Sequence, residues 1–283
     1  MRRGRASTTA QFIAFNRALG NLSPQVRGFS DETAERFLPP RWAKQVEQAR
    51  TRLPKSPSPF WLKGIVLFNQ LRTAVLDRAI LAALPFEQMV ILGAGFDGRA
   101  WRLSALRNTI VFEVDHPATQ ARKKEMATKL PPLVKEVRFV PLDFARDDLS
   151  HQLRQAGFDA GKKTFWLWEG VTMYLVPSDV QGTLATIREI SPSGSRVALT
   201  YMARTKLSMV TRLFLLGFGL FTGEPLRSSF TGADLDALAR SSGWETLSNT
   251  GIENWRLDLA PALSLKQRQV GIQWNERIWV ARH

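Results

Sequence analysis

The sequence predicts an α/β fold: a doubly wound, seven-stranded sheet that is mostly parallel, has an antiparallel edge strand, and carries an N-terminal helical cap. Three observations predict it. From residue 87 onward, short apolar runs alternate with helix-like stretches, which is typical of a parallel sheet covered on both faces. A glycine-rich segment directly follows the first apolar run. The 86 residues before it carry helical periodicity instead.

The first 86 residues are expected to form a cap that does not fold independently, and residues 87–283 a ligand-binding domain. The spacing of apolar residues predicts three helices in the cap: Thr9–Leu19, Asp31–Phe37 with Asp31 as N-cap, and Gly64–Leu84. Prolines between the second and third of these predict a loop over Leu53–Pro59, because proline lacks the backbone donor that a helix needs.

The remaining residues supply the expected sheet. The predicted strands are Met89–Leu92, Ile110–Val114, Val137–Pro141, Phe165–Trp168, Arg196–Thr200, Trp244–Asn249 and Glu276–Ala281. The last two are separated by a turn-rich stretch with few helical signs, which favours an antiparallel pair at the sheet edge. Helices are predicted over Ala118–Leu130 and Pro177–Ile190. Residues 202–229 are long for a simple connection, so we expect a cap insertion there.

Composition excludes several classes of protein. The chain has 283 residues, of which 44% are hydrophobic, enough to bury a core. It has no cysteine, which excludes disulfides, thiolate nucleophiles and Cys-type zinc sites. No apolar signal segment follows Met1–Arg5, and the apolar run Leu207–Phe221 is shorter than the ~20 residues of a membrane span. We therefore expect a cytoplasmic protein without a membrane span.

The glycine-rich segment indicates the ligand. Gly93, Gly95 and Gly98 form a G-x-G-x-x-G motif after the first predicted strand. Glycines there permit a tight turn and close approach of backbone N–H groups to a ligand. The second strand ends with Glu113 and Asp115, 20 and 22 residues after Gly93, and a carboxylate at that position can accept ribose hydroxyls. The combination predicts an adenosine-containing ligand: NAD or S-adenosylmethionine (SAM).

Three features favour SAM over NAD. A long helical leader precedes the motif. The Tyr-x-x-x-Lys pair of short-chain dehydrogenases is absent, since Tyr174 and Tyr201 are followed four residues later by Ser178 and Thr205. Asp97 lies inside the glycine loop, where a carboxylate would repel a pyrophosphate but tolerate a cofactor with a sulfonium and an ammonium group.

Longer motifs resemble a known family. Ile91–Leu103 resembles the first motif of the leucine carboxyl methyltransferase-like family, which includes bacterial SAM-dependent O-methyltransferases with the Rossmann-like class I methyltransferase fold. Phe112–Pro117 and Trp168–Leu175 resemble its second and fourth-strand motifs. Shorter similarities occur at Thr9–Ala10, Arg17–Ala18, Leu71–Thr73 with Asp77, and Gly223–Pro225. The chain departs from the family at Gly98, where Thr or a similar residue is common, and this departure keeps the dehydrogenase alternative open.

The resemblance implies a cofactor-binding set, with S-adenosylhomocysteine (SAH) as product. Asp115 would hold the ribose. Arg72 would bind the carboxylate of the cofactor, and Glu169 its ammonium group. The remaining members are Gly93, Ala94 and Gly95, against the methionine part, and Asp143 and Phe144, beside the adenine.

The acceptor is expected to be a small molecule methylated on oxygen. A carboxylate acceptor, with a reference pKa near ~4, needs no general base, whereas a phenol, near ~10, does. The sequence offers no obvious base, which favours a carboxylate that Tyr174 could orient. The apolar run Leu213–Phe221 suggests a hydrophobic, polyketide-like acceptor. With three histidines and no nearby acidic cluster, no metal site is expected.

Charge keeps a second class of acceptor open. The net charge is +14, and residues 1–86 hold 14 basic and 5 acidic side chains. A protein-carboxyl or nucleic-acid methyltransferase is therefore an alternative, and an NAD-dependent oxidoreductase is a third. The basic residues are interspersed, so nucleic acid is not the expected partner. Arg99 is expected to pair internally with Asp97 or Glu113, and His116 to cap or pack.

Overall fold

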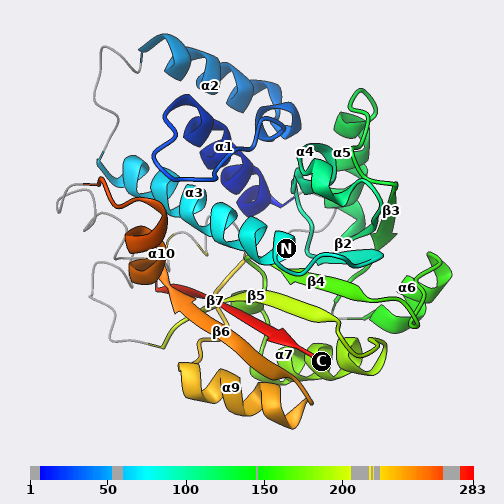
Figure 1. The fold of residues 1–283 in the computed structure, drawn as a ribbon. Helices are drawn as coiled ribbons and strands as arrows, with labels where there is room; N and C mark the ends of the chain where they lie inside the picture. Colours follow the sequence, from blue (N-terminus) through cyan, green and yellow to red (C-terminus); the bar gives the residue numbers. More distant parts are fainter. Residues whose placement is uncertain are drawn as a thin grey trace.

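The computed structural model describes residues 7–52, 60–144, 146–204, 217, 219, 224–263 and 275–283. Within them, one seven-stranded sheet forms the centre of the molecule (Figure 1). Its strands are β1 (Gln88–Leu92), β2 (Ile110–Asp115), β3 (Glu136–Pro141), β4 (Thr164–Trp168), β5 (Arg196–Met202), β6 (Glu245–Gly251) and β7 (Glu276–Arg282). All seven predicted strands are present, which confirms the α/β fold.

The strand order is β3-β2-β1-β4-β5-β7-β6. The first five strands pair in parallel, while β7 pairs antiparallel with both β5 and β6. The expected antiparallel pair is thus found at this side of the sheet, and the reversed strand, β7, lies one position in from the edge. The order reverses direction between β1 and β4, and ligands of open α/β sheets bind at such a switch point.

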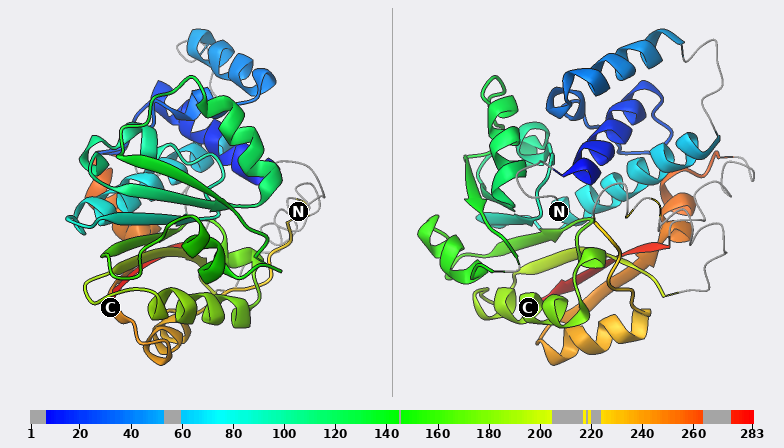
Figure 2. Two further views of the ribbon diagram at one scale, coloured as in Figure 1. Left: turned by 90° about the vertical axis from the view of Figure 1, so that its right-hand side faces the viewer. Right: turned by 180° about the vertical axis from the view of Figure 1, so that it is seen from behind.

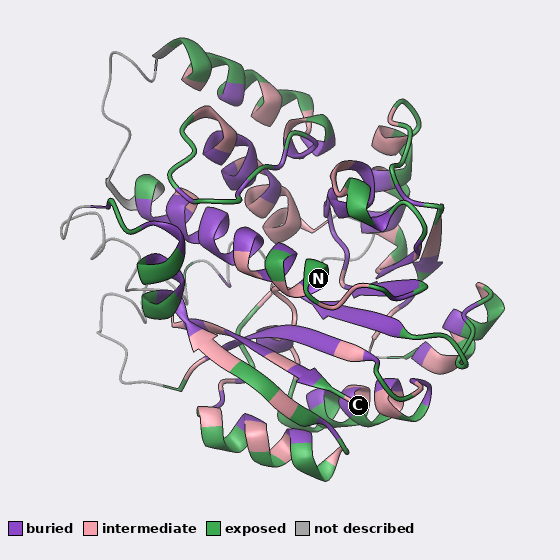
Figure 3. Cartoon of the chain, in the orientation of Figure 1, coloured by how far each residue is buried: buried purple, intermediate pink, exposed green. Residues whose placement is uncertain are grey.

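Side chains of each strand alternate between two cores. Met89 and Ile91 of β1 join the core beneath the N-terminal helices, whereas Val90 and Leu92 join the opposite core. The helices around the sheet are α4 (Arg99–Arg102), α5 (Pro117–Ala127), α6 (Leu149–Gln155), α7 (Pro177–Glu189), α9 (Gly232–Ser241) and α10 (Ile252–Leu259). Both faces of the sheet are covered by helices (Figure 2), so the central strands β1 and β4 are buried, while the edge strand β6 and the outer faces of α2 and α9 are partly exposed (Figure 3). The fold is therefore doubly wound, as expected.

The N-terminal region packs as α1 (Thr8–Leu22), α2 (Pro40–Arg52) and α3 (Phe60–Leu81). The predicted helix Asp31–Phe37 is wrong, because only a short 3-10 helix, η1 (Ala34–Phe37), forms there. Asp31 is not its N-cap; its fully buried carboxylate pairs with Arg17 at 3.0 Å. Helix α2 was not predicted from the sequence. Its Pro40 occupies the first turn, where the missing N–H costs no helical hydrogen bond.

A second unpredicted helix, α10, lies between β6 and β7, in the stretch expected to be turn-rich. It packs on α3 through Trp255, whose ring centroid lies 6.4 Å from that of Phe68. An eight-residue helix is too short to be stable alone, so this tertiary contact, rather than local propensity, stabilises it.

The predicted cap insertion at 202–229 lies largely outside the described residues, as does most of Leu213–Phe221. Two single positions of that segment, Gly217 and Gly219, are described. In the described part of the chain, no helix combines the length and the apolar character that crossing a bilayer requires.

Candidate functional site

The glycine loop follows β1 and is held against β2. The backbone N–H groups of Gly93 and Ala94 donate to the carbonyl of Val114, at 2.8 and 3.0 Å. Gly93 and Gly95 have φ values of +71° and +48°, a region that side chains rarely adopt. A Cβ at Gly93 would also overlap the side chain of Val171, which follows β4. Both glycines are therefore required by the shape of the loop.

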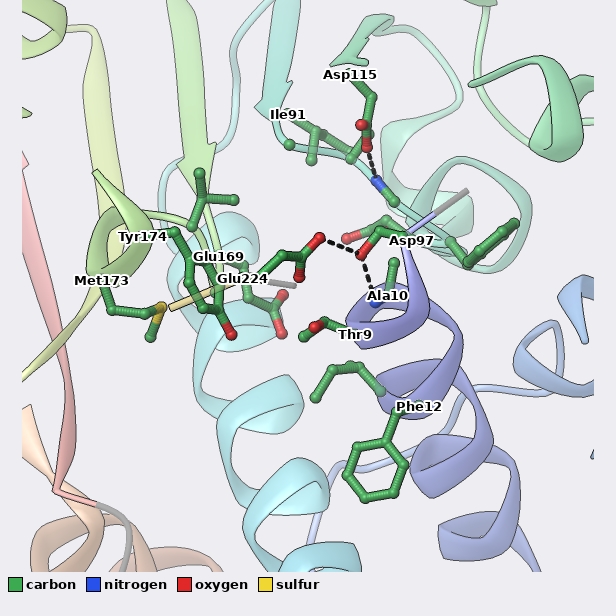
Figure 4. Close-up of a pocket in the computed structure, with 18 of the residues that line it drawn as sticks. Thr9, Ala10, Phe12, Ile91, Asp97, Asp115, Glu169, Met173, Tyr174 and Glu224 are labelled. Atoms are coloured by element: carbon green, nitrogen blue, oxygen red, sulfur yellow. Dashed lines mark hydrogen bonds between the residues drawn. The ribbon is translucent and has the colours of Figure 1, made fainter. Parts of the chain in front are cut away.

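Asp115, the last residue of β2, faces this loop. Its carboxylate accepts hydrogen bonds from the backbone N–H of Gly95 and, at 2.6 Å, from that of His116 (Figure 4). Burial raises the pKa of Asp115, and these two backbone donors counter that effect. The carboxylate is thus fixed at the mouth of the loop.

A cavity of about 360 Å³ opens at the carboxyl ends of β1, β2 and β4. Its lining contains Tyr174 and all the residues that the sequence assigned to the cofactor: Arg72, Gly93, Ala94, Gly95, Asp115, Asp143, Phe144 and Glu169. The start of α1 also lines it, through Ser7, Thr9 and Ala10, and the Ala10 methyl lies 3.0 Å from the position of a Cβ on Gly95. The N-terminal cap therefore forms one wall of the cavity.

A network of buried charges lies behind the glycine loop. Arg99 is fully buried and contacts Asp77 and Glu169, both at 2.7 Å, together with Asp97. The expected internal partner Asp97 is confirmed. The alternative partner, Glu113, is not in contact with Arg99, because it forms its own buried ion pair with Lys123 at 2.7 Å.

Glu169 follows β4 and is shared by two guanidinium groups. Its Oε2 lies 2.7 Å from Arg99 Nη1, and its Oε1 lies 2.9 Å from Arg72 Nε. Burial raises the pKa of Glu169, but Arg99 and Arg72 outweigh burial and hold the pKa below its ordinary value. Glu169 is therefore an ionised carboxylate at neutral pH, buried at the cavity wall.

Glu276, which sequence reasoning missed, completes this wall. Arg72 Nη1 donates to both of its carboxylate oxygens, at 3.0 and 3.1 Å, and the Glu276 side chain is 2% exposed. Because β7 is reversed, its first residue pairs with Met202, the last residue of β5. Its amino end thus lies beside the carboxyl ends of the parallel strands. The sequence does show a carboxylate at the start of the last predicted strand. Its place in the site depends on the antiparallel direction of β7.

Apolar side chains make up much of the remaining cavity lining. The apolar residues there include Phe12, Ile13, Ile65, Phe68, Met173, Met202 and Leu226. Tyr174, Glu169 and Glu224 face the same space (Figure 4). Burial raises the pKa of Tyr174, and the nearby Glu224 raises it further, so the phenol keeps its proton at neutral pH. Tyr174 can therefore donate a hydrogen bond to a ligand in this cavity.

Gly98 has a different role from the first two glycines. Its φ is −102°, and it is not part of the cavity lining. A Cβ at this position would overlap Thr33 Oγ1 and crowd Asp31. Gly98 is therefore a packing glycine that lets the N-terminal segment approach α4. The G-x-G-x-x-G pattern of this chain is no indication of a dinucleotide site.

The histidines do not form a metal centre in the described residues. His116 caps α5, since its Nδ1 accepts from the backbone N–H of Ala118 at 3.2 Å, as expected. His151 lies on the exposed side of α6 beside Gln155. Across the described ranges, no group of three or more His, Asp or Glu side chains is arranged to hold a metal ion.

Comparisons with known proteins agree with this geometry. Residues 10–188 match the family model described as leucine carboxyl methyltransferase. A Mycobacterium sp. (strain MCS) protein is 35% identical over 175 residues, which span 60% of this chain and 69% of that protein. The YktD protein of Bacillus subtilis (strain 168) is 30% identical over 234 residues, covering 79% and 72%. The names of both predict SAM-dependent methyltransferase activity.

Solved structures agree on the fold. A crystal structure from Thermobifida fusca, whose title predicts a methyltransferase, superposes with a TM-score of 0.62 at 16% identity, covering 99% of this chain and 96% of that one. A DUF574 family protein of Streptomyces avermitilis gives 0.60 at 13% identity, covering 98% and 97%. The family match covers more than half of the chain, and its motifs surround the cavity. The chain belongs to the leucine carboxyl methyltransferase family and is a SAM-dependent methyltransferase.

Proposed function

We propose that the chain transfers the methyl group of SAM to an oxygen atom of a small, largely apolar acceptor. The observation that carries the proposal is a single cavity whose lining combines two kinds of side chain. Asp115, Glu169 and Arg72 supply charged groups around the glycine loop, and many of the other lining residues are apolar. Its volume of about 360 Å³ lies within the usual range of small-molecule sites, ~300–1,000 Å³.

The charged groups of the lining suit the cofactor group by group. Asp115 is the acceptor for ribose hydroxyls, as at the end of the second strand in other nucleotide-binding sheets. Glu169 is ionised and suits the ammonium group, while Arg72 suits the carboxylate of the methionine part. Gly93 and Gly95 admit that part against their backbone.

The adenine end of the cofactor is assigned to the residues after β3. Asp143 and Phe144 line the cavity together with Leu142, which is held by a backbone hydrogen bond to Asp115 at 2.9 Å. An aromatic ring and an aliphatic side chain suit the faces of a purine, and a carboxylate suits its exocyclic amine.

The second task of the protein is to place the acceptor. Bound SAM supplies an electrophilic methyl group, and holding the acceptor oxygen about 3 Å from it in line supplies much of the rate enhancement. The protonated Tyr174 donates a hydrogen bond that orients the acceptor oxygen. This arrangement suits a carboxylate, which needs no general base, and a hydroxyl is the second acceptor to test.

A macromolecular acceptor is less well supported. Residues 1–86 carry a net positive charge, which could attract an acidic macromolecule. Two of the basic residues are nevertheless buried in ion pairs: Arg17 with Asp31, and Arg72 with Glu169 and Glu276. The start of α1 also forms a wall of the cavity. A small acceptor fits a cavity of about 360 Å³ better than a folded protein or a nucleic acid does.

Two measurements test the proposal. Calorimetric titration should show binding of SAM and SAH and no binding of NAD. SAH release should then be followed over sets of three apolar compounds that share one skeleton and carry a carboxylate, a hydroxyl or an amine, with mass spectrometry locating the new methyl group. Methylation confined to amines, or to proteins or RNA, would contradict O-methylation of a small acceptor while leaving the cofactor assignment intact.

A further inference from the structure

Glu276 and Arg72 form a buried pair that the proposed cofactor contacts do not explain. Arg72 is 4% exposed and Glu276 2% exposed. Both carboxylate oxygens of Glu276 accept from the same guanidinium nitrogen, Nη1, and Asn69 accepts from Nη2 at 3.2 Å. Burying two charges is costly, and leaving one of them unpaired is costlier still. The pair is therefore a strong constraint on where the guanidinium lies.

Glu169 cannot provide that constraint alone. Its Oε2 forms an ion pair with Arg99, which also pairs with Asp77 and Asp97. Its Oε1 lies 2.9 Å from Arg72 Nε but without hydrogen-bond alignment. Burial lowers the pKa of Arg72, and Glu276, ahead of Glu169, raises it, with a net increase. Glu276 is thus the dominant anionic partner of Arg72.

We infer that Glu276 is a positioning residue, which holds Arg72 for the cofactor carboxylate and prevents the guanidinium from closing fully onto Glu169. The inference rests on the proposed assignment of Arg72 and Glu169 to the two ends of the amino-acid group. Without Glu276, Arg72 would turn toward Glu169, its remaining carboxylate. Both the carboxylate-binding group and the ammonium-binding group would then be misplaced by a single change.

If Glu276 positions Arg72, its loss should weaken binding only of ligands that carry the amino-acid group of the cofactor. SAH carries the amino-acid group, whereas 5′-methylthioadenosine has the same adenosine and thioether without it. Replacement Glu276→Gln keeps the size and one acceptor oxygen but removes the charge. We expect the Kd of SAH to rise about tenfold or more, and the Kd of methylthioadenosine to change less than about twofold, in calorimetric titrations of the full chain.

Two further variants make the result specific. Glu245→Gln, on the neighbouring strand β6, removes an exposed partner of Arg282 and should leave both Kd values unchanged. Melting temperatures of all variants report whether they fold. If Glu276→Gln does not fold, Glu276→Asp replaces it, since it retains the charge but withdraws the carboxylate by one methylene. It should raise the Kd of SAH selectively as well.

The outcomes separate this inference from the proposed function. Equal weakening of both ligands, or of neither, by the folded Glu276 variant overturns the positioning role. Arg72→Lys is the test of the underlying assignment, and it should also weaken SAH selectively. If Arg72→Lys discriminates between the ligands and the Glu276 variant does not, only the inference fails. If Arg72→Lys does not discriminate either, the assignment of Arg72 to the cofactor carboxylate fails with it.

Discussion

At the scale of single residues, the absence of a side chain at Gly98 allows close packing against Thr33. Its backbone is in an ordinary conformation, yet a Cβ would overlap Thr33 Oγ1. Thr33 donates from that oxygen to Asp31 at 2.7 Å, and Asp31 in turn pairs with Arg17. One glycine therefore permits the contact between the N-terminal segment and the charge network behind the cavity.

Gly98→Ala is expected to lower the free energy of unfolding by about 1–3 kcal/mol, the usual cost of an overpacked site. Urea denaturation measures it. Adding Thr33→Ala removes the overlapping oxygen, so the double variant should lose less than the sum of the two single changes. Gly182→Ala is the control. It lies in α7 with nothing near its Cβ position, and should stabilise by about 0.5–1 kcal/mol.

Asp115 carries a second prediction at this scale. Asp115→Ala should weaken SAM binding at least about tenfold, because it removes the ribose acceptor and also the partner of the Gly95 N–H. Calorimetric titration measures the change. Asp258→Ala, which removes an exposed partner of Arg78, is a matched control and should bind normally. Unchanged SAM affinity in the Asp115 variant would contradict the ribose assignment.

At the scale of elements, a buried ion pair joins β2 to α5. Glu113 and Lys123 are each 1% exposed, and the Lys123 ammonium also lies over the rings of Phe37 and Trp101, at 5.6 and 5.1 Å. Burial raises the pKa of Glu113 to about 7, although Lys123 counteracts it. The pair therefore connects the central sheet to η1 and α4, away from the ligand.

This pair predicts a pH dependence of stability. In the folded chain the pKa of Glu113 lies above its ordinary value of 4.5. Between pH 4.5 and 7 the folded state therefore binds more protons than the unfolded state, and the free energy of unfolding falls as the pH rises. The loss is of order 2–3 kcal/mol. Urea denaturation between pH 5 and 8 should show this loss in the native chain and not in Glu113→Gln/Lys123→Met. Parallel profiles for the two proteins would contradict the raised pKa.

At the scale of the whole molecule, the cap and the sheet share one core. Ala14 and Ala18 of α1 and Leu71 of α3 belong to the same hydrophobic cluster as Met89 and Ile91 of β1. The charge network also crosses the boundary at residue 86, since Arg72 and Asp77 belong to the cap side, and Arg99, Glu169 and Glu276 to the other. The two regions are thus joined by apolar and by ionic contacts.

We therefore predict that residues 87–283 do not fold without the first 86. The fragment would expose one face of the sheet and leave Arg99 and Glu169 without cap-side partners, which is costly for buried charges. Thermal unfolding followed by near-ultraviolet circular dichroism should be cooperative for the full chain and absent for the fragment. A cooperative transition in the fragment would show instead that the cap is dispensable for folding.

The sequence by itself determined the α/β fold and the seven strands, and it indicated a set of proposed cofactor residues that all line the cavity. These follow from local signals: apolar runs mark buried strands, glycines mark a loop of unusual shape, and carboxylates at strand ends mark the switch point. It did not reveal α2 and α10, because a proline pair and a turn-rich stretch have weak local preferences that tertiary packing overrides.

Only the tertiary structure decided how the charges are partnered. The sequence predicts Asp31 as a helix cap, but Asp31 is a buried ion-pair partner of Arg17, because the segment folds back onto Gly98. Glu276 lies more than 200 residues from Arg72, and the reversed direction of β7 alone brings the two together. Pairings between distant residues depend on strand order and direction, which no local pattern encodes. The sequence thus indicated many of the groups that line the cavity, and the fold decided which of them hold one another in place.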